Sequence, residues 1–196
     1  DGTSPLIKDF VPLAALEDLV FGGWDVFEDD VYAAASHAGV LDQKTLDALK
    51  EPLSKIKPMK AVFDRNYVKR LEGSHVKQAA TKWELAEMAR EDIRNFKADN
   101  GCDRLVMIWC GSTEIFLTPT AVHDTIETFE QGLKDNDEGI APSMIYAYAA
   151  LMEKVPYLNG APNLSVDMPC MLELADRQGV PVGGKDFKTG QTLMKT

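Results

Sequence analysis

The chain has few cysteines and histidines, and no spacing brings them together. Its three cysteines, Cys102, Cys110 and Cys170, are far apart, and so are its three histidines. An odd number of widely spaced cysteines predicts reduced thiols rather than a disulfide framework, which is typical of a cytoplasmic protein. No pair has the short spacing of a zinc site, so the sequence predicts no bound transition metal.

Positive charge is scarce as well. The 196 residues include 21 lysines and arginines against 31 aspartates and glutamates, which gives a net charge of −10 at pH 7. Such an acidic chain argues against binding to nucleic acid or to an anionic membrane. No apolar run approaches the length of a membrane span, and no signal peptide opens the chain. An acidic protein can still bind a phosphorylated sugar where a few lysines converge.

A third absence concerns nucleotides. No Gly-x-Gly-x-x-Gly sequence occurs anywhere in the chain. This turn holds the pyrophosphate of a dinucleotide at the start of a helix. A complete dinucleotide site therefore cannot be built from these residues alone.

What the chain does have is a regular alternation of apolar and amphipathic segments. The strand-like segments are 19–21, 59–63, 105–110, 155–158 and 180–182. The helical segments are about 28–37, 42–56, 82–100, 121–134, 142–154 and 168–177. This alternation predicts an α/β fold with a parallel sheet. Segment 105–110 is apolar throughout, which predicts a strand buried on both faces.

Local signals mark the helix ends. Thr81 and Glu84 form a capping box, and Asp42 and Asp167 are placed to cap two other helices. Pro142 suits the first position of a helix that has almost no polar face and should be buried.

Polar loops follow the strand-like segments. They are 22–25, 64–66, 111–114, 159–163 and 183–188. Ligands of open α/β sheets bind beyond the carboxyl ends of the strands, so we expect these loops to line one binding edge. In the last loop, lysines lie beside a Gly-Gln-Thr turn that opens a helix, which indicates a site for an anionic substrate. The alternative is an ordinary solvated loop between a strand and a helix.

Four motifs carry a family resemblance. They are Phe21-Gly22-Gly23-Trp24-Asp25, Trp109-Cys110-Gly111-Ser112-Thr113-Glu114, Asn159-Gly160-Ala161-Pro162-Asn163 and Lys185-Asp186-Phe187-Lys188-Thr189-Gly190-Gln191-Thr192. In this order they resemble the inositol-3-phosphate synthase (myo-inositol-1-phosphate synthase) family along essentially the whole chain. Lys185 and Leu193 differ from the acidic residue and the lysine of eukaryotic members, so the likeness is closer to a bacterial branch.

The resemblance implies a Rossmann-like α/β fold with helices on both faces of a parallel sheet, incomplete at both ends. Residues 1–188 would be a partial NAD-binding domain without its first Gly-rich strand-turn-helix, and 189–196 would begin the catalytic and tetramerisation domain. We therefore expect residues 1–196 alone to lack synthase activity.

The activity that the resemblance implies is the NAD-dependent conversion of D-glucose 6-phosphate to 1D-myo-inositol 3-phosphate, by a cytoplasmic homotetramer. The partners would be a sugar phosphate and further copies of the chain, without nucleic acid or membrane. Two alternatives stay open. One is another NAD-dependent oxidoreductase on the same scaffold, and the other is a non-catalytic relative that binds a phosphate ligand.

The resemblance also implies residue roles. Catalytic roles fall to Lys188, Lys195 and Asp186. Contacts with NAD fall to Gly22, Gly23, Trp24, Asp25, Ser112, Thr113, Asn159 and Gly160. Contacts with the substrate fall to Asn163, Gly190, Gln191 and Thr192, and no metal ligand is assigned.

Structural alternatives exist for several of these residues. Lys188 can be a solvated loop lysine, and Asp186 can cap a helix. Asn159 and Asn163 can hold their own turn through side-chain hydrogen bonds. Ser112 and Thr113 can cap a helix, and acidic residues such as Asp25 are often structural after a Gly-Gly turn.

Overall fold

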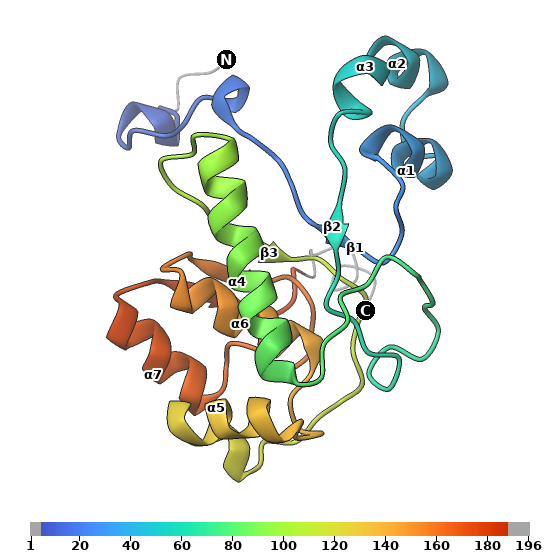
Figure 1. The fold of residues 1–196 in the computed structure, drawn as a ribbon. Coiled ribbons are helices and arrows are strands. Elements are labelled where there is room, and N and C mark those ends of the chain that lie inside the picture. Colours follow the sequence, from blue (N-terminus) through green and yellow to red (C-terminus); the bar gives the residue numbers. More distant parts are fainter. Residues whose placement is uncertain (1–4, 188–196) are drawn as a thin grey trace, which may run out of the picture.

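The computed structural model describes residues 5–187 and shows short strands alternating with helices (Figure 1). The strands are β1 (Trp24–Asp25), β2 (Met59–Lys60), β3 (Met107–Trp109), β4 (Tyr157–Asn159) and β5 (Val182–Gly184). The helices are α1 (Val31–Ala38), α2 (Gln43–Ala48), α3 (Lys50–Leu53), α4 (Lys82–Asp99), α5 (Ile126–Asp135), α6 (Pro142–Met152) and α7 (Pro169–Gln178). Short 3-10 turns are η1 (Ile7–Asp9), η2 (Leu16–Asp18) and η3 (Ala121–His123).

The strands form two parallel sheets. In the first, β1 pairs with β2, and Trp24 lies opposite Met59. In the second, β4 lies between β3 and β5, so that Tyr157 pairs with Met107 on one side and with Val182 on the other. Helices fill the connection between each pair of neighbouring strands, as parallel pairing requires. This arrangement confirms the predicted Rossmann-like α/β fold.

The core is built around α6, which the sequence predicted to be buried. Every residue from 142 to 151 is buried. The small side chains of Ala86 and Ala89 let α4 approach α6 closely. From α5, the ring centroid of Phe129 lies 5.8 Å from that of Tyr148 of α6. Figure 1 shows α4, in green, lying alongside α6.

Most helix ends follow local sequence signals. The Thr81 hydroxyl accepts the Glu84 N–H at 3.2 Å, and the Glu84 carboxylate accepts the Thr81 N–H at 3.2 Å, which confirms the capping box. Asp42 caps α2 by accepting the Thr45 N–H at 3.0 Å. Gly39 ends α1 in the left-handed conformation at φ 63°, where glycine is unstrained.

The helix predicted over 42–56 is divided. It separates into α2 and α3 at Leu49, whose φ and ψ of −103° and 4° are not helical. Pro52 lacks the N–H that would bond to the carbonyl of Ala48, so a continuous helix loses a hydrogen bond at this point.

The helix predicted over 121–134 is divided too. It becomes η3 followed by α5, because Thr125 adopts an extended conformation and caps α5 by accepting the Thr128 N–H at 3.2 Å.

The prediction that Asp167 caps α7 is wrong. Met168 occupies the cap position without a side-chain hydrogen bond, and Pro169 begins the helix. The Asp167 carboxylate instead accepts the Ser165 N–H at 3.2 Å and the Lys185 ammonium at 2.8 Å. These two bonds hold the pKa of Asp167 below its usual value against the opposing effect of burial.

The first strand lies later in the chain than predicted. Residues 19–21 are exposed, and β1 consists of Trp24 and Asp25. The Gly23 carbonyl accepts the Met59 N–H at 2.8 Å as β1 begins. Gly22 and Gly23 therefore precede the paired residues, and Asp25 alone of the predicted loop stands at the carboxyl end of β1.

Two other strand predictions need correction. Gly183 and Gly184 belong to β5 itself, so the polar loop begins at Lys185. In segment 105–110, Val106 is 61% exposed and Ile108 is 51% exposed, so burial on both faces is not observed within the described residues. Alternate side chains of a strand point to opposite faces, and only the face of Met107 and Trp109 meets the core.

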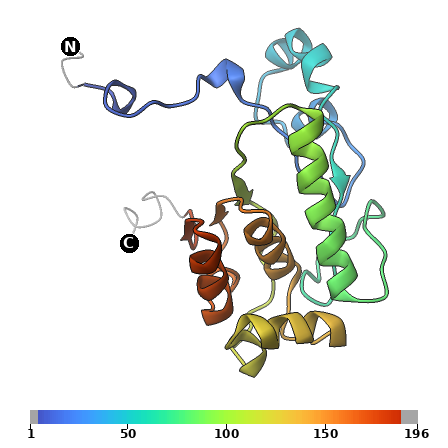
Figure 2. The ribbon, with the colours of Figure 1, turned by 60° about the vertical axis from the view of Figure 1, so that its left-hand side comes forward.

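Residues 5–22 carry η1 and η2 and contain no buried residue. Figure 2 shows this blue segment extending away from the rest of the chain. Within residues 5–187, no helix combines the length and the hydropathy that crossing a membrane demands.

Candidate functional site

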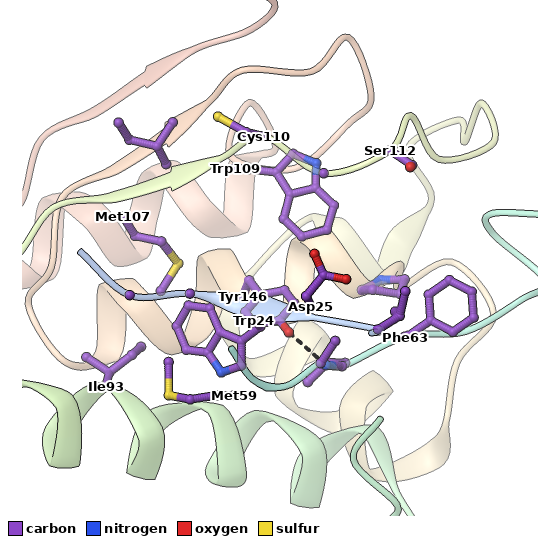
Figure 3. A pocket seen from close by; sticks show the side chains of 18 of the residues that line it. Trp24, Asp25, Met59, Phe63, Ile93, Met107, Trp109, Cys110, Ser112 and Tyr146 are labelled. Carbon is purple, nitrogen blue, oxygen red and sulfur yellow. Dashed lines mark hydrogen bonds between the residues drawn. The ribbon is translucent and has the colours of Figure 1, made fainter. Parts of the chain in front are cut away.

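A cavity of about 560 Å³ lies between β1 and β3 (Figure 3). Both strands line it along their length, and Figure 3 shows them running in the same direction. Its walls are mostly apolar, with Trp24 and Met59 on one side and Met107 and Trp109 on the other. Parallel strands present their carboxyl ends on one side, so the loops after β1 and β3 open onto the same edge.

Tyr146 of α6 lies between the two sheets. Its ring centroid is 4.9 Å from that of Trp24 and 5.6 Å from that of Trp109. Its hydroxyl accepts the Val62 N–H at 2.7 Å, and burial raises the pKa of Tyr146 above its usual value. One buried tyrosine thus fixes the distance between β1 and β3.

Trp24 is also held from α4. Its indole N–H donates to the Asp92 carboxylate at 2.6 Å, and the Lys77 ammonium lies 2.7 Å from the same carboxylate. The side chains of Lys77 and Asp92 are only 8% and 19% exposed, so each needs the other to offset the loss of water. The predicted cofactor residue Trp24 is therefore rigidly placed.

Of the predicted cofactor residues, Gly22, Gly23, Trp24, Asp25 and Ser112 line this cavity together. Asp25 is exposed at the carboxyl end of β1, where its carboxylate accepts the Phe27 N–H at 3.0 Å. The structure thus brings residues from two distant motifs to one place.

The loop after β3 borders a second cavity. This space of about 340 Å³ is lined by Thr113 and Ile115 and by the segment 67–71, which contains Lys69 and Arg70. Ser112 and Glu114 line both cavities. Ser112 and Thr113 begin no helix, so the alternative that they cap one is not observed.

Glu114 lies in a buried polar cluster. It is 4% exposed, and its carboxylate accepts hydrogen bonds from Ser143 and Asn163. The sequence motif contains Glu114, but sequence reasoning gave the residue no role. Its one signal is a carboxylate placed directly after an apolar strand segment and a polar turn.

Asn159 stabilises its own turn, as one of its two interpretations predicted. It is fully buried; its Nδ2 donates to the Asn163 carbonyl at 2.8 Å, and its Oδ1 accepts the Ala161 N–H at 3.0 Å. A contact of the Asn159 side chain with a cofactor stays a prediction. Gly160 donates its N–H to the Trp109 carbonyl at 2.9 Å, and a Cβ here would lie 2.7 Å from that oxygen.

The predicted substrate residue Asn163 is 6% exposed and points into the cluster of Glu114. Asp186 is exposed at a positive φ of 66°, and its N–H donates to the Ala161 carbonyl at 3.2 Å. The loop after β5 thus lies against the turn after β4, as the predicted binding edge requires. The other predicted residues, Lys188, Gly190, Gln191, Thr192 and Lys195, lie outside the described residues.

The carboxyl edge of this cavity suits the nucleoside part of a dinucleotide better than its phosphates. Asp25 and Ser112 offer hydrogen-bonding groups for hydroxyls there, while Trp24 and Trp109 pack on Tyr146. No lysine or arginine is among the described residues that line it. Within residues 5–187, no three His, Cys, Asp or Glu side chains gather as ligands for a metal ion.

Comparisons with known proteins agree with this geometry. The NAD-binding family model described as myo-inositol-1-phosphate synthase matches residues 1–193. Inositol-3-phosphate synthase 1 of Bacteroides thetaiotaomicron is 54% identical over 97% of this chain and 45% of its own length. Inositol-3-phosphate synthase of Trypanosoma brucei brucei is 39% identical over 99% of this chain and 38% of its own length.

A solved structure gives the same result. The crystal structure of inositol-3-phosphate synthase from Caenorhabditis elegans superimposes with a TM-score of 0.89 at 30% identity, over 96% of this chain and 37% of that chain. The chain spans less than half the length of these relatives. The likeness covers nearly all of this chain, so the chain belongs to the inositol-3-phosphate synthase family.

Proposed function

We propose that this chain is part of an inositol-3-phosphate synthase that converts D-glucose 6-phosphate to 1D-myo-inositol 3-phosphate with NAD. One observation carries the proposal. Asp25 and Ser112, which belong to motifs about 90 residues apart, line one cavity at the carboxyl ends of two parallel strands. Such an edge is where nucleotides bind in folds of this class.

The residues of the cavity have separable roles. Trp24 and Trp109 pack on Tyr146 and hold the carboxyl ends of β1 and β3 in position. Asp25 accepts a hydrogen bond from a ribose hydroxyl, and Ser112 donates one from the loop after β3. NAD, when bound, supplies a reversible hydride transfer at C5 of the sugar.

The predicted catalytic residues follow the last strand. Asp186 lies in the loop that packs against the turn after β4, close to the predicted cofactor residue Gly160. In the proposal Asp186 orients Lys188 and Lys195, whose ammonium groups bind sugar oxygens and move protons at the C5 hydroxyl and at C6. Burial and a neighbouring positive charge lower the pKa of a lysine towards neutrality, so this residue type is suited to proton transfer.

The two sheets supply a place for the missing phosphate-binding turn. A strand inserted between β1 and β3 in their common direction would join both sheets into one, because each strand already lines the cavity. A Gly-rich turn at its carboxyl end would then lie between Asp25 and Ser112. The proposed enzyme is a homo-oligomer of the cytoplasm.

The test is a product assay on the complete protein with glucose 6-phosphate and NAD. We expect inositol 3-phosphate without net consumption of NAD. Asp25→Ala should raise the KM for NAD about tenfold, because it removes a charged hydrogen bond of about 1.5 kcal/mol. The control Asp29→Ala changes an exposed carboxylate that does not line the cavity, and it should leave the KM unchanged.

Other outcomes contradict the proposal in distinct ways. Binding of NAD with oxidation of a substrate but without inositol phosphate would favour a different oxidoreductase. Binding of a phosphate ligand without turnover would favour a non-catalytic relative.

A further inference from the structure

Glu114 is a buried acid that the proposed function does not use. Among residues 5–187 it is the single Asp, Glu, Lys or Arg residue that is buried as a whole. Burial of a carboxylate is costly unless hydrogen bonds replace its water. The partners of Glu114 therefore indicate what the residue holds in place.

These partners come from two other segments. Glu114 Oε1 accepts the Ser143 N–H at 2.8 Å, and Oε2 accepts the Ser143 hydroxyl at 2.5 Å and Asn163 Nδ2 at 3.0 Å. Asn163 Nδ2 also lies 2.9 Å from Ser143 Oγ. One carboxylate thus joins the loop after β3, the first turn of α6 and the loop after β4.

The first turn of α6 depends on this carboxylate. The cap residue Ala141 makes no side-chain hydrogen bond, and Pro142 has no N–H to offer. A helix needs acceptors for the N–H groups of its first turn, and a negative charge there is favoured by the helix dipole. The Glu114 carboxylate supplies the acceptor that the Ala141 side chain cannot, although Glu114 lies 29 residues before Ser143 in the sequence.

The charge of Glu114 has no counter-ion among the described residues. Two tyrosines face it: Tyr157 of β4, whose hydroxyl donates to the Ser143 carbonyl at 3.2 Å, and Tyr67, whose carbonyl accepts the Ile115 N–H at 2.9 Å. Lys69 and Arg70 line the second cavity together with Glu114 but form no ion pair with it in the described part of the chain. Burial raises the pKa of Glu114 to about 7, although the bonds from Ser143 lower it. Both protonation states are therefore populated near neutral pH.

The hydrogen bonds of the cluster are incomplete. Asn163 Oδ1 and Ser165 Oγ are buried and have no hydrogen-bond partner among residues 5–187. While Glu114 is ionised, Asn163 turns its NH2 group towards the carboxylate. A proton on Glu114 would turn its carboxyl group into a hydrogen-bond donor. Asn163 Oδ1 could accept this hydrogen bond after the amide group rotates. The cluster thus has two arrangements that differ by one proton.

We propose that Glu114 is a positioning residue, which fixes the loop Gly111–Thr113 against α6. The affinity of this loop for the dinucleotide then depends on whether Glu114 is protonated. Ser112, two residues before Glu114, lines the cavity with Asp25, so a shift at Glu114 moves a predicted cofactor contact. The proposal rests on the proposed function for its ligand.

The test uses the complete protein and NAD itself. The Kd for NAD, the KM for NAD and kcat are measured from pH 5.5 to 8.5. In the unsubstituted protein the Kd should change at least about fivefold across a midpoint near 7. Glu114→Gln should make the Kd independent of pH while kcat at saturating NAD changes less. The control Glu91→Gln, on the exposed face of α4, should keep the original profile.

Ser143→Ala distinguishes the proposed positioning role of Glu114 from a purely structural role. It removes the hydroxyl bond that lowers the pKa of Glu114, so the midpoint of the Kd profile should move to higher pH. A purely structural role would lower stability without moving this midpoint.

A Glu114→Gln protein that is folded and keeps the original pH profile overturns the proposal, and so does an unmoved midpoint in Ser143→Ala. If Glu114→Gln does not fold, the midpoint in Ser143→Ala decides alone. An unsubstituted protein that binds no NAD overturns the proposed function as well, which distinguishes the two failures.

Discussion

Residues 5–60 and the region around α6 differ in the exposure of their apolar side chains. In residues 5–60, Val26 and Leu46 are the buried residues, while large apolar side chains from Leu6 to Leu49 are exposed. In α6, residues 142–151 are buried without exception. Since burial of apolar surface drives folding, the region around α6 contributes most of the stability of this chain. The exposed apolar surface of residues 5–60 is typical of an interface.

The largest effect expected from this comparison is a matched pair of leucine truncations. Leu151 is 0% exposed and Leu16 is 81% exposed. Leu151→Ala should lower the free energy of unfolding by about 4 kcal/mol, because it leaves a cavity in the core. Leu16→Ala should change it by less than about 0.5 kcal/mol. Denaturant unfolding measures both, and equal losses would show that residues 5–60 share the core.

The next effect concerns the contact that ties the two regions together. Asp92 binds the Trp24 indole and the Lys77 ammonium. Asp92→Ala leaves Lys77 buried without a counter-charge, so we expect a loss of about 3 kcal/mol in the free energy of unfolding and a red shift of Trp24 fluorescence. Its control is Glu91→Ala, one residue earlier on an exposed position of α4. A stable Asp92→Ala protein with unchanged fluorescence would mean that β1 is held by its pairing with β2.

A smaller effect is the pH dependence of stability from Glu114. Its pKa is raised to about 7 in the folded chain by burial, so the folded state binds a proton that the unfolded state releases at lower pH. Stability from this group is therefore complete at acid pH and is lost as the pH rises through 7. We expect the free energy of unfolding to fall by about 2 kcal/mol from pH 5 to 8, and Glu114→Gln should remove this slope.

The same contrast explains what the sequence could predict. Thr81, Asp42 and Gly39 act on backbone groups within four residues, so their roles follow from local sequence alone. The alternation of strands and helices likewise predicted the parallel sheets.

The two divided helices have local causes at Pro52 and Thr125, but the other errors arose where a distant residue decides the structure. Asp167 pairs with Lys185, 18 residues later, instead of capping α7. The burial of Glu114 requires donors at Ser143 and Asn163, which no local pattern could have indicated. β1 begins at Trp24 because Met59 pairs with it there. Of the candidate site, the sequence could name residues 22–25 and 112 but not the residues that hold them.

The smallest expected effect compares two helix caps of the same kind in the two regions. Thr81 caps α4, which packs on α6, whereas Asp42 caps α2, where Leu46 is the one buried residue. Thr81→Ala should lower the free energy of global unfolding by about 1 kcal/mol, the usual value of a cap. Asp42→Ala removes a similar bond, but its effect should appear as faster amide exchange in α2, with global unfolding nearly unchanged, because local and global opening are separate events. Hydrogen exchange and denaturant unfolding on the same samples decide the matter, since an equal global loss in both variants would mean that α2 unfolds only together with the core.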